Sequence, residues 1–249
     1  MTRTPHADKV LAAAIDDFRR ATSFDELWAA LHRHLEGFGI LRVMYGSKAS
    51  LLAPQLTNIY RCSYAKDYLE EKEKEKEGLA ADYCVQAVQR ERKPILWSDT
   101  RRIAEIAQES TRRSLAIDRK YGVMTGVSLP FRFNDNLGGG GFGLHAPNMG
   151  WSEFDRIWKE HAATIQAICR GFDIQVRKSW ASTLMPLSDL EKECLRRLGA
   201  GYQAKQIAHQ LGISAKAVGR QTDKARDTLK ASNATQAVMN AMAYKLIPA

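Results

Sequence analysis

The chain lacks the features of a secreted, membrane-spanning or zinc-binding protein. It has four cysteines, Cys62, Cys84, Cys169 and Cys194, and none shows the close spacing of a disulfide framework or a zinc site. No run approaches the roughly 20 apolar residues that a membrane-spanning helix needs. The N-terminal segment has Asp and His before its apolar run and acids inside it, which excludes a signal peptide. We therefore expect a soluble cytoplasmic protein with reduced thiols and no membrane partner.

Motifs for phosphate binding and covalent catalysis are also missing. The glycines at 138–141 precede Phe142 rather than the Lys and Ser/Thr of a P-loop. The enzyme alternative would use Cys84 with His145 or His161, but Cys84 falls in a predicted helix and no carboxylate partner can be assigned. We therefore expect no enzymatic activity, no metal and no cofactor.

Positive charge is in excess, and it is concentrated near the C-terminus. The formal net charge is +9 and the isoelectric point is about 9.4. From Leu187 onward, ten basic residues stand against five acidic ones, so this last quarter carries a net charge of +5. Such a charge balance favours an acidic partner, and nucleic acid is the leading candidate.

The first two thirds of the chain predict an α/β domain. Two helices open it, and the second begins at Ser23, whose hydroxyl can cap the first turn. β-Branched and aromatic residues predict strands at 40–46 and 56–62. Two extended runs surround 134–136 and 138–141, which predicts a hairpin whose glycines form a long flexible tip. We expect an antiparallel sheet flanked by helices.

The charged run and the end of this domain leave alternatives open. At 68–83 acids and bases alternate, so attraction and repulsion between neighbouring turns largely cancel on a helix, and we expect a solvated helix end or a loop. The apolar residues of 154–172 recur at helical spacing, as in an ordinary packed helix or a dimer interface. The segment 177–186 loses this period and ends in proline, which predicts a linker between domains 1–176 and 187–249.

The last quarter of the chain predicts an all-α domain of four helices. Ser188 and Glu191 fit a capping box, and Gly201 follows the end of the first helix. Gly212 ends the second helix and Ser214 can cap the third. Two short helices joined by a Gly-Ile-Ser turn are typical of a helix-turn-helix motif.

The third of these helices has one apolar side and one cationic side. Its cationic side carries Lys216, Arg220 and Lys224, spaced by four. Such a helix suits the major groove of DNA, in which phosphates attract cations and base edges confer specificity. A solvated basic face is the alternative, and the preceding helix and turn favour DNA. The residues expected to contact DNA are Lys205, Lys216, Arg220, Gln221 and Lys224.

This segment resembles the DNA-binding domain of LuxR-type regulators. Glu191, Leu195 and Gly201 occupy recurrent structural positions of that family, and the "QIA" helix and "GIS" turn follow its pattern. Ala217 and Gln221 stand where Thr and His are common, which affects the bases that are read. The resemblance implies a bacterial transcription regulator that binds double-stranded promoter DNA as a homodimer on an inverted repeat. It also allows contact with RNA polymerase.

The front half resembles the acyl-homoserine-lactone-binding domain of quorum-sensing LuxR regulators. The spacing of Asp82 from Trp97, the "WSD" that begins at Trp97, and "YGVMTGVSLPF" carry this resemblance. It implies that Asp82 accepts a hydrogen bond from the amide N–H of the ligand, that Trp97 packs over the lactone, and that Gly126 allows close packing. Asp82 can equally serve as a helix cap.

The rest of the implied ligand site departs from the family. Simple spacing places the family's Trp and Tyr on Leu69 and Glu73, whereas an insertion in the charged run would give their places to Tyr64 and Tyr68. A phenol can donate to a carbonyl, so these tyrosines allow a related ligand. Two hypotheses follow. In the first, a lactone or related small amphipathic signal controls the regulator; in the second, an orphan regulator fills its pocket with its own side chains.

Overall fold

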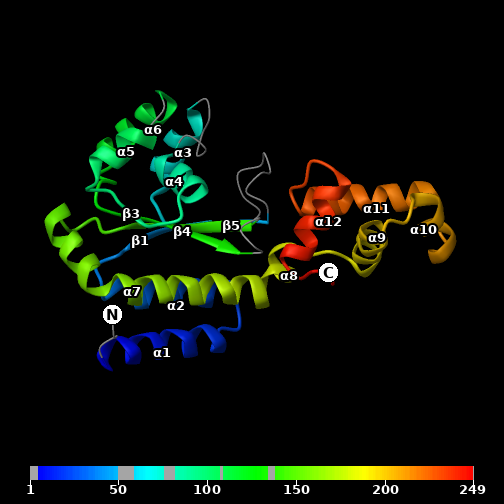
Figure 1. Ribbon diagram of the computed structural model, residues 1–249, viewed down its shortest axis with the longest axis horizontal. Helices are drawn as coiled ribbons and strands as arrows, with labels where there is room; N and C mark the ends of the chain where they lie inside the picture. Colours follow the sequence, from blue (N-terminus) through cyan, green and yellow to red (C-terminus); the bar gives the residue numbers. More distant parts are fainter. Residues whose placement is uncertain (1–4, 50–58, 76–81, 107–108, 134–137, 249) are drawn as a thin grey trace.

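A computed structural model describes residues 5–49, 59–75, 82–106, 109–133 and 138–248. The N-terminal part is a five-stranded antiparallel sheet with strand order β2-β1-β5-β4-β3 and with helices on both faces (Figure 1). Its elements are α1 (Pro5–Arg20), α2 (Phe24–Glu36), β1 (Arg42–Lys48), β2 (Ile59–Cys62), α3 (Lys66–Lys74), α4 (Tyr83–Arg90), β3 (Ile95–Leu96), α5 (Thr100–Ile106), α6 (Glu109–Lys120), β4 (Gly126–Phe133), β5 (Gly138–His145) and α7 (Trp151–Gln175). The expected α/β class is therefore confirmed.

The sheet separates two helical layers. Helices α2 and α7 cover one face, with α1 outside them, and α3 to α6 lie over the other face (Figure 1). Because side chains alternate along a strand, Tyr45 of β1 and Phe142 of β5 point toward α7, and their rings lie 5.2 and 5.9 Å from the ring of Phe172. This aromatic packing forms the main core of the N-terminal part.

The prediction that the glycines at 138–141 form the hairpin tip is wrong. Gly138–Gly141 do not form the tip, because they lie within β5, where Gly141 pairs with Gly46 of β1 and Pro130 of β4. Pairing on both sides overrides the low strand propensity of glycine. The residues at 134–136, also assigned to the tip, lie outside the described residues.

The C-terminal part is helical, as predicted. It comprises α9 (Asp189–Gly199), α10 (Ala204–Leu211), α11 (Ala215–Thr228) and α12 (Ala234–Ala243). The capping box is confirmed: the Ser188 hydroxyl accepts from the Glu191 amide at 3.2 Å, and the Glu191 carboxylate accepts from the Ser188 amide at 2.8 Å. The segment predicted as a linker is helical as far as Leu184, through a π-helical turn at Val176–Trp180 and α8 (Ala181–Leu184). No helix in the described part of the chain is long and apolar enough to cross a membrane.

The two parts touch through the end of α12. Tyr244 is buried, and its hydroxyl lies 3.1 Å from the Ser47 hydroxyl of β1. Its ring packs 6.3 Å from that of Phe133 in β4, and the Arg177 guanidinium lies 4.4 Å from the Phe133 ring on the way out of α7. The apolar core is therefore continuous from the sheet into the C-terminal helices.

Candidate functional site: a helix-turn-helix and a sensor cavity

Helices α10 and α11 form the turn that the sequence predicts. Gly212 ends α10 with a φ of 65°, a left-handed conformation that glycine adopts without strain. The Ser214 hydroxyl then accepts from the Ala217 amide at 3.1 Å and caps α11. Val218 and Ala225 of α11 are buried against the preceding helices. Local chemistry therefore fixes both the turn and the side of α11 that faces inward.

The outward side of α11 is cationic. Lys216, Arg220 and Lys224 are exposed, and so is Lys205 on α10, whereas Gln221 is half-buried. None of these four cations forms an ion pair among the residues that the structure describes. The nearby Asp223 does not neutralise the row, because its carboxylate pairs with Arg226 at 2.7 Å. The row can therefore meet phosphates without first breaking an ion pair.

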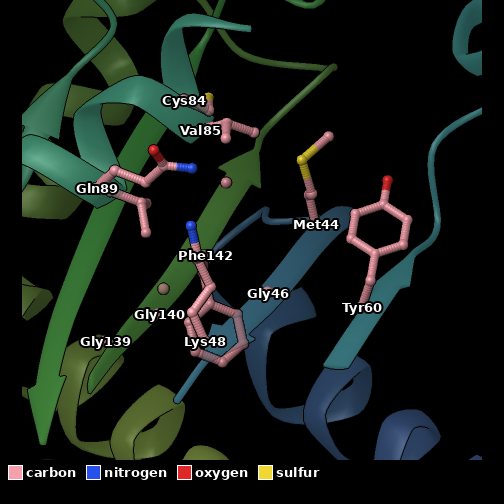
Figure 2. Close-up of a pocket in the computed structure, with 13 residues that line it drawn as sticks. Met44, Gly46, Lys48, Tyr60, Cys84, Val85, Gln89, Gly139, Gly140 and Phe142 are labelled. Atoms are coloured by element: carbon pink, nitrogen blue, oxygen red, sulfur yellow. The ribbon is translucent and has the colours of Figure 1, made fainter. Parts of the chain in front are cut away.

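A small apolar cavity lies between α4 and the sheet (Figure 2). It exists because the strip of β5 at 139–143 carries one side chain, Phe142, among glycines. Cys84, Val85 and Gln89 reach it from α4, and Met44 and Tyr60 from the neighbouring strands. Its volume of about 50 Å³ is far below the roughly 300 Å³ of a small-molecule site. The cavity therefore has little free volume in this state.

Stacked aromatic rings lie beside this cavity. The ring of Tyr64 stacks on Tyr68 at 5.4 Å and on His145 at 5.7 Å, and Trp97 stacks on the other side of His145 at 5.9 Å. Burial is the main cause that lowers the pKa of His145 to about 4, so its neutral ring donates from Nε2 to the carbonyl of Gly122 at 3.2 Å. This stack fixes the rings of the implied ligand site in place.

Trp97 is held by two further contacts. Its Nε1–H donates to the Ser128 hydroxyl at 3.0 Å, which lies 3.3 Å from the Tyr83 hydroxyl. A Cβ atom added to Gly126 would lie 2.9 Å from the Trp97 ring, so only glycine allows this approach. The indole N–H is therefore committed within the protein.

The Asp82 carboxylate is also committed. Oδ1 accepts from the Cys84 amide at 2.8 Å and so caps α4, and Oδ2 accepts from the Nζ of Lys72 at 2.8 Å. Asp82 is 2% exposed and Lys72 is fully buried. Together with Tyr64, Tyr68 and Trp97, Asp82 borders a second cavity of about 10 Å³, which is room for about one water molecule.

Lys72 bridges two buried carboxylates. Its Nζ lies 2.6 Å from Asp118 Oδ1, and it donates to the Ser114 carbonyl at 3.0 Å and to the Ser114 hydroxyl at 2.5 Å. Burial alone lowers the pKa of Lys72, but the charges of Asp82 and Asp118 outweigh it, so the pKa lies above its ordinary value. Burial, followed by repulsion from Asp82, raises the pKa of Asp118 to about 6 against the opposing effect of Lys72. The Lys72 ammonium thus lies between the carboxyl groups of Asp82 and Asp118.

Two family models match the chain. The autoinducer binding domain matches residues 23–172, which is more than half of the chain, and the LuxR family of bacterial regulatory proteins matches residues 185–241. The chain belongs to the LuxR family of transcriptional regulators. The regulator therefore combines a small-molecule-binding domain with a DNA-binding helix-turn-helix, and the family is not enzymatic.

Solved structures of two related regulators resemble this LuxR-family chain. SdiA in complex with octanoyl-rac-glycerol has 16% sequence identity and a TM-score of 0.59, covering 98% of this chain and 97% of that one. Escherichia coli SdiA has 17% sequence identity and a TM-score of 0.57, covering 97% of this chain and 99% of that one. The N-acylhomoserine-lactone-dependent LuxR-family factor CepR2 from Burkholderia cenocepacia has 12% identity and a TM-score of 0.49, covering 69% of this chain and 98% of that one. No curated protein sequence matches the regulator. At these identities the likeness concerns the fold.

The structure brings most of the expected ligand residues of this LuxR-family regulator together. Tyr64, Tyr68, Asp82 and Trp97 border the smaller cavity. Of the two residues that simple spacing suggested, Leu69 packs partly buried against the tyrosines, whereas Glu73 is exposed. Among the structural positions of the DNA-binding domain, Leu195 is buried in the core, Glu191 completes the capping box, and Gly201 adopts a φ of 89°.

Sequence reasoning missed the buried part of the charged run. The solvated segment expected at 68–83 is a helix as far as Lys74, and its residues at 76–81 lie outside the described ones. Lys72 follows Tyr68 by four residues, so both share the inward side of α3, and this spacing is a signal that could have been used. Asp118 and Ser114 lie far along the chain on α6, and no local pattern indicates their contact with Lys72.

The enzyme alternative with Cys84 does not hold for this LuxR-family regulator. Cys84 is buried, and burial is the main cause that raises the pKa of its thiol well above the ordinary value. The reactive form of cysteine is the thiolate, which this environment suppresses. Of its two proposed partners, His145 is held by the aromatic stack and by Gly122, and His161 lies on α7, where its ring packs against Phe38.

Proposed function

We propose that the regulator binds promoter DNA through α11 as a homodimer in the bacterial cytoplasm. The main support is the exposed row of Lys216, Arg220 and Lys224 on α11, which follows the Gly-Ile-Ser turn. Exposed apolar side chains support the dimer: Ile174 on α7 is 49% exposed, and Met239 on α12 is 42% exposed. A two-fold dimer reads an inverted repeat, and at a promoter it can contact RNA polymerase.

Arg220→Ala tests the DNA-binding helix. With DNA fragments selected by the protein from a random-sequence pool, we expect Kd to rise about tenfold and the slope of log Kd against log salt to fall by about one. The other proposed contacts, Lys205 and Gln221, should give smaller effects. Lys159→Ala is the matched control, because it removes an exposed cation from α7. Unchanged binding by Arg220→Ala would refute the assignment of α11.

We further propose that the N-terminal part responds to a small amphipathic molecule. An apolar chain suits the cavity beside the glycine strip, and Tyr60 and Gln89 offer polar groups at its wall. Trp97, Tyr64 and Tyr68 enclose the neighbouring space. Because the cavity holds about 50 Å³, α4 must move away from the sheet to admit such a chain. Binding to the widened form would favour that conformation by mass action.

Melting temperatures test this part of the proposal. The panel contains acyl-homoserine lactones of different chain lengths and an amide-free acylglycerol of the kind bound to SdiA. We expect one molecule to raise the melting temperature by about 5 °C at saturation. Gly143→Leu should abolish the rise, because its side chain enters the cavity. Gly143→Ala is the milder control, since the added Cβ would lie 3.4 Å from the Cys84 sulfur, an ordinary contact.

An orphan regulator without a signal is the second candidate. The small volume of both cavities and the bond of Asp82 to Lys72 favour it, because the protein already satisfies its own polar groups there. A folded protein that binds DNA and whose melting temperature no member of the panel changes would support this candidate over the signal-responsive one.

A further inference from the structure

Lys72 is the one buried cation of α3, whose inward side it shares with Tyr68. Lys66 and Lys74 of α3 are exposed, whereas Lys72 has no exposed surface. An ammonium has three N–H donors, and four oxygen atoms surround this one: Asp82 Oδ2, Asp118 Oδ1 and both oxygens of Ser114, at 2.5 to 3.0 Å. The donors of Lys72 are therefore fully used.

Both carboxylate oxygens of Asp82 also accept hydrogen bonds within the protein. One of its oxygens holds the first turn of α4 and the other holds Lys72. Each carboxylate oxygen can accept a second hydrogen bond, but Asp82 is 2% exposed and the cavity beside it holds about 10 Å³. A ligand amide therefore has room to reach this carboxylate only by displacing one of these donors. Displacing Lys72 would leave a buried ammonium without its partner, and displacing the Cys84 amide would uncap α4. A neutral amide is a weaker donor to a carboxylate than an ammonium, so the exchange is unfavourable.

We propose that Lys72 is the specificity-determining residue of the sensor domain: it excludes neutral amide donors from Asp82, and the place of its side chain is a site for a primary ammonium. This inference rests on the proposed function of the N-terminal part as a small-molecule site. It confines a signal to the apolar cavity beside the glycine strip and excludes the amide-bearing lactones that the family resemblance implies.

The charges of the cluster define the ammonium site. Without Lys72, Asp82 and Asp118 would face each other, buried, with no cation between them. Two such carboxylates demand either a proton or a cation. The atoms that Lys72→Ala removes correspond to n-propylammonium, and the tyrosine ring of Tyr68, 5.3 Å from Nζ, also favours a cation there. The vacated place thus fits a short primary alkylammonium.

Chemical rescue of the full-length Lys72→Ala protein tests the proposal. We expect its melting temperature to fall by about 10 °C, because a buried ion pair loses one partner. Millimolar n-propylammonium chloride should restore at least half of this loss, whereas n-propyltrimethylammonium, which has no N–H donor, should not. Wild type and Lys74→Ala should respond to neither salt. Equal rescue by both cations, or a wild-type melting temperature in Lys72→Ala, would overturn the proposal.

A second measurement uses the wild-type protein, so the proposal stays testable if Lys72→Ala does not fold. Amide-bearing acyl-homoserine lactones should leave the wild-type melting temperature unchanged. A rise of several degrees that Asp82→Asn abolishes would overturn the exclusion. No rise with any compound of the panel, the amide-free acylglycerol included, would count against the small-molecule site alone, because the rescue of Lys72→Ala involves no signal molecule.

Discussion

Asp118 gives the buried cluster a pH dependence that can be measured. Its carboxylate bonds to Lys72 and accepts from the Tyr68 hydroxyl at 2.8 Å, inside the N-terminal part. Burial, and then the charge of Asp82, raise its pKa from the ordinary 3.8 to about 6. Asp118→Asn keeps the shape and one hydrogen-bond acceptor but no longer titrates.

The raised pKa fixes the sign and size of the effect. In wild type, the folded state binds the Asp118 proton more tightly than the unfolded state does. The resulting stabilisation is complete below the unfolded pKa of about 3.8 and disappears as the pH rises through about 6. Its full extent is about 3 kcal/mol, of which about 2 kcal/mol is lost between about pH 4.5 and about pH 7.5.

Urea unfolding of wild type and Asp118→Asn at these two pH values measures the effect. Groups remote from the cluster titrate alike in both proteins, so their contributions cancel in the difference between the two free energies of unfolding. We expect Asp118→Asn to gain about 2 kcal/mol relative to wild type on going from about pH 4.5 to about pH 7.5. A difference that stays constant, or that changes in the opposite direction, would refute the placement of Asp118 in a buried cluster beside Asp82.

Three further substitutions test the packing described above. Tyr244→Phe removes the bond to Ser47 and should lower the free energy of unfolding by about 1 kcal/mol in urea titrations, with no effect expected if the C-terminal part does not rest on β1. Gly126→Ala should lower it by about 2 kcal/mol or more and change the near-ultraviolet circular dichroism of Trp97, because the added Cβ would clash with the backbone oxygen of Leu144 and lie 2.9 Å from the Trp97 ring. Asp173→Ala leaves a buried tyrosine hydroxyl and an arginine without their shared partner, and should lower the melting temperature by about 5 °C or more; an unchanged melting temperature would contradict that network.

The elements that the sequence predicts best are those whose cause is local. The cap at Ser188, the turn after Gly212 and the cap at Ser214 depend on residues within four positions of one another, and all are observed. The four-helix C-terminal part was therefore predictable, as was the cationic side of α11. Its use in binding a particular promoter is not encoded in such local signals.

Long-range contacts explain what the sequence did not reveal. Lys72 lies 46 residues before Asp118, and only the packing of α3 against α6 brings them together. In the same way, the glycines of β5 predicted a loop, because nothing in the nearby sequence indicates that β1 and β4 pair with them. The family resemblance supplied information that local pattern could not: Tyr64, Tyr68, Asp82 and Trp97 lie around one cavity, and their role in binding a ligand stays a prediction.

Two neighbouring residues of β1, Gly46 and Ser47, contact different parts of the molecule. Gly46 borders the apolar cavity, whereas Ser47 faces the other way and meets Tyr244 of the C-terminal part. A planar peptide bond joins the two, so a substitution that shifts one must shift the other. Variants selected for a wider cavity should therefore be assayed for DNA affinity as well, because this strand links the shape of the sensor cavity to the contact with Tyr244.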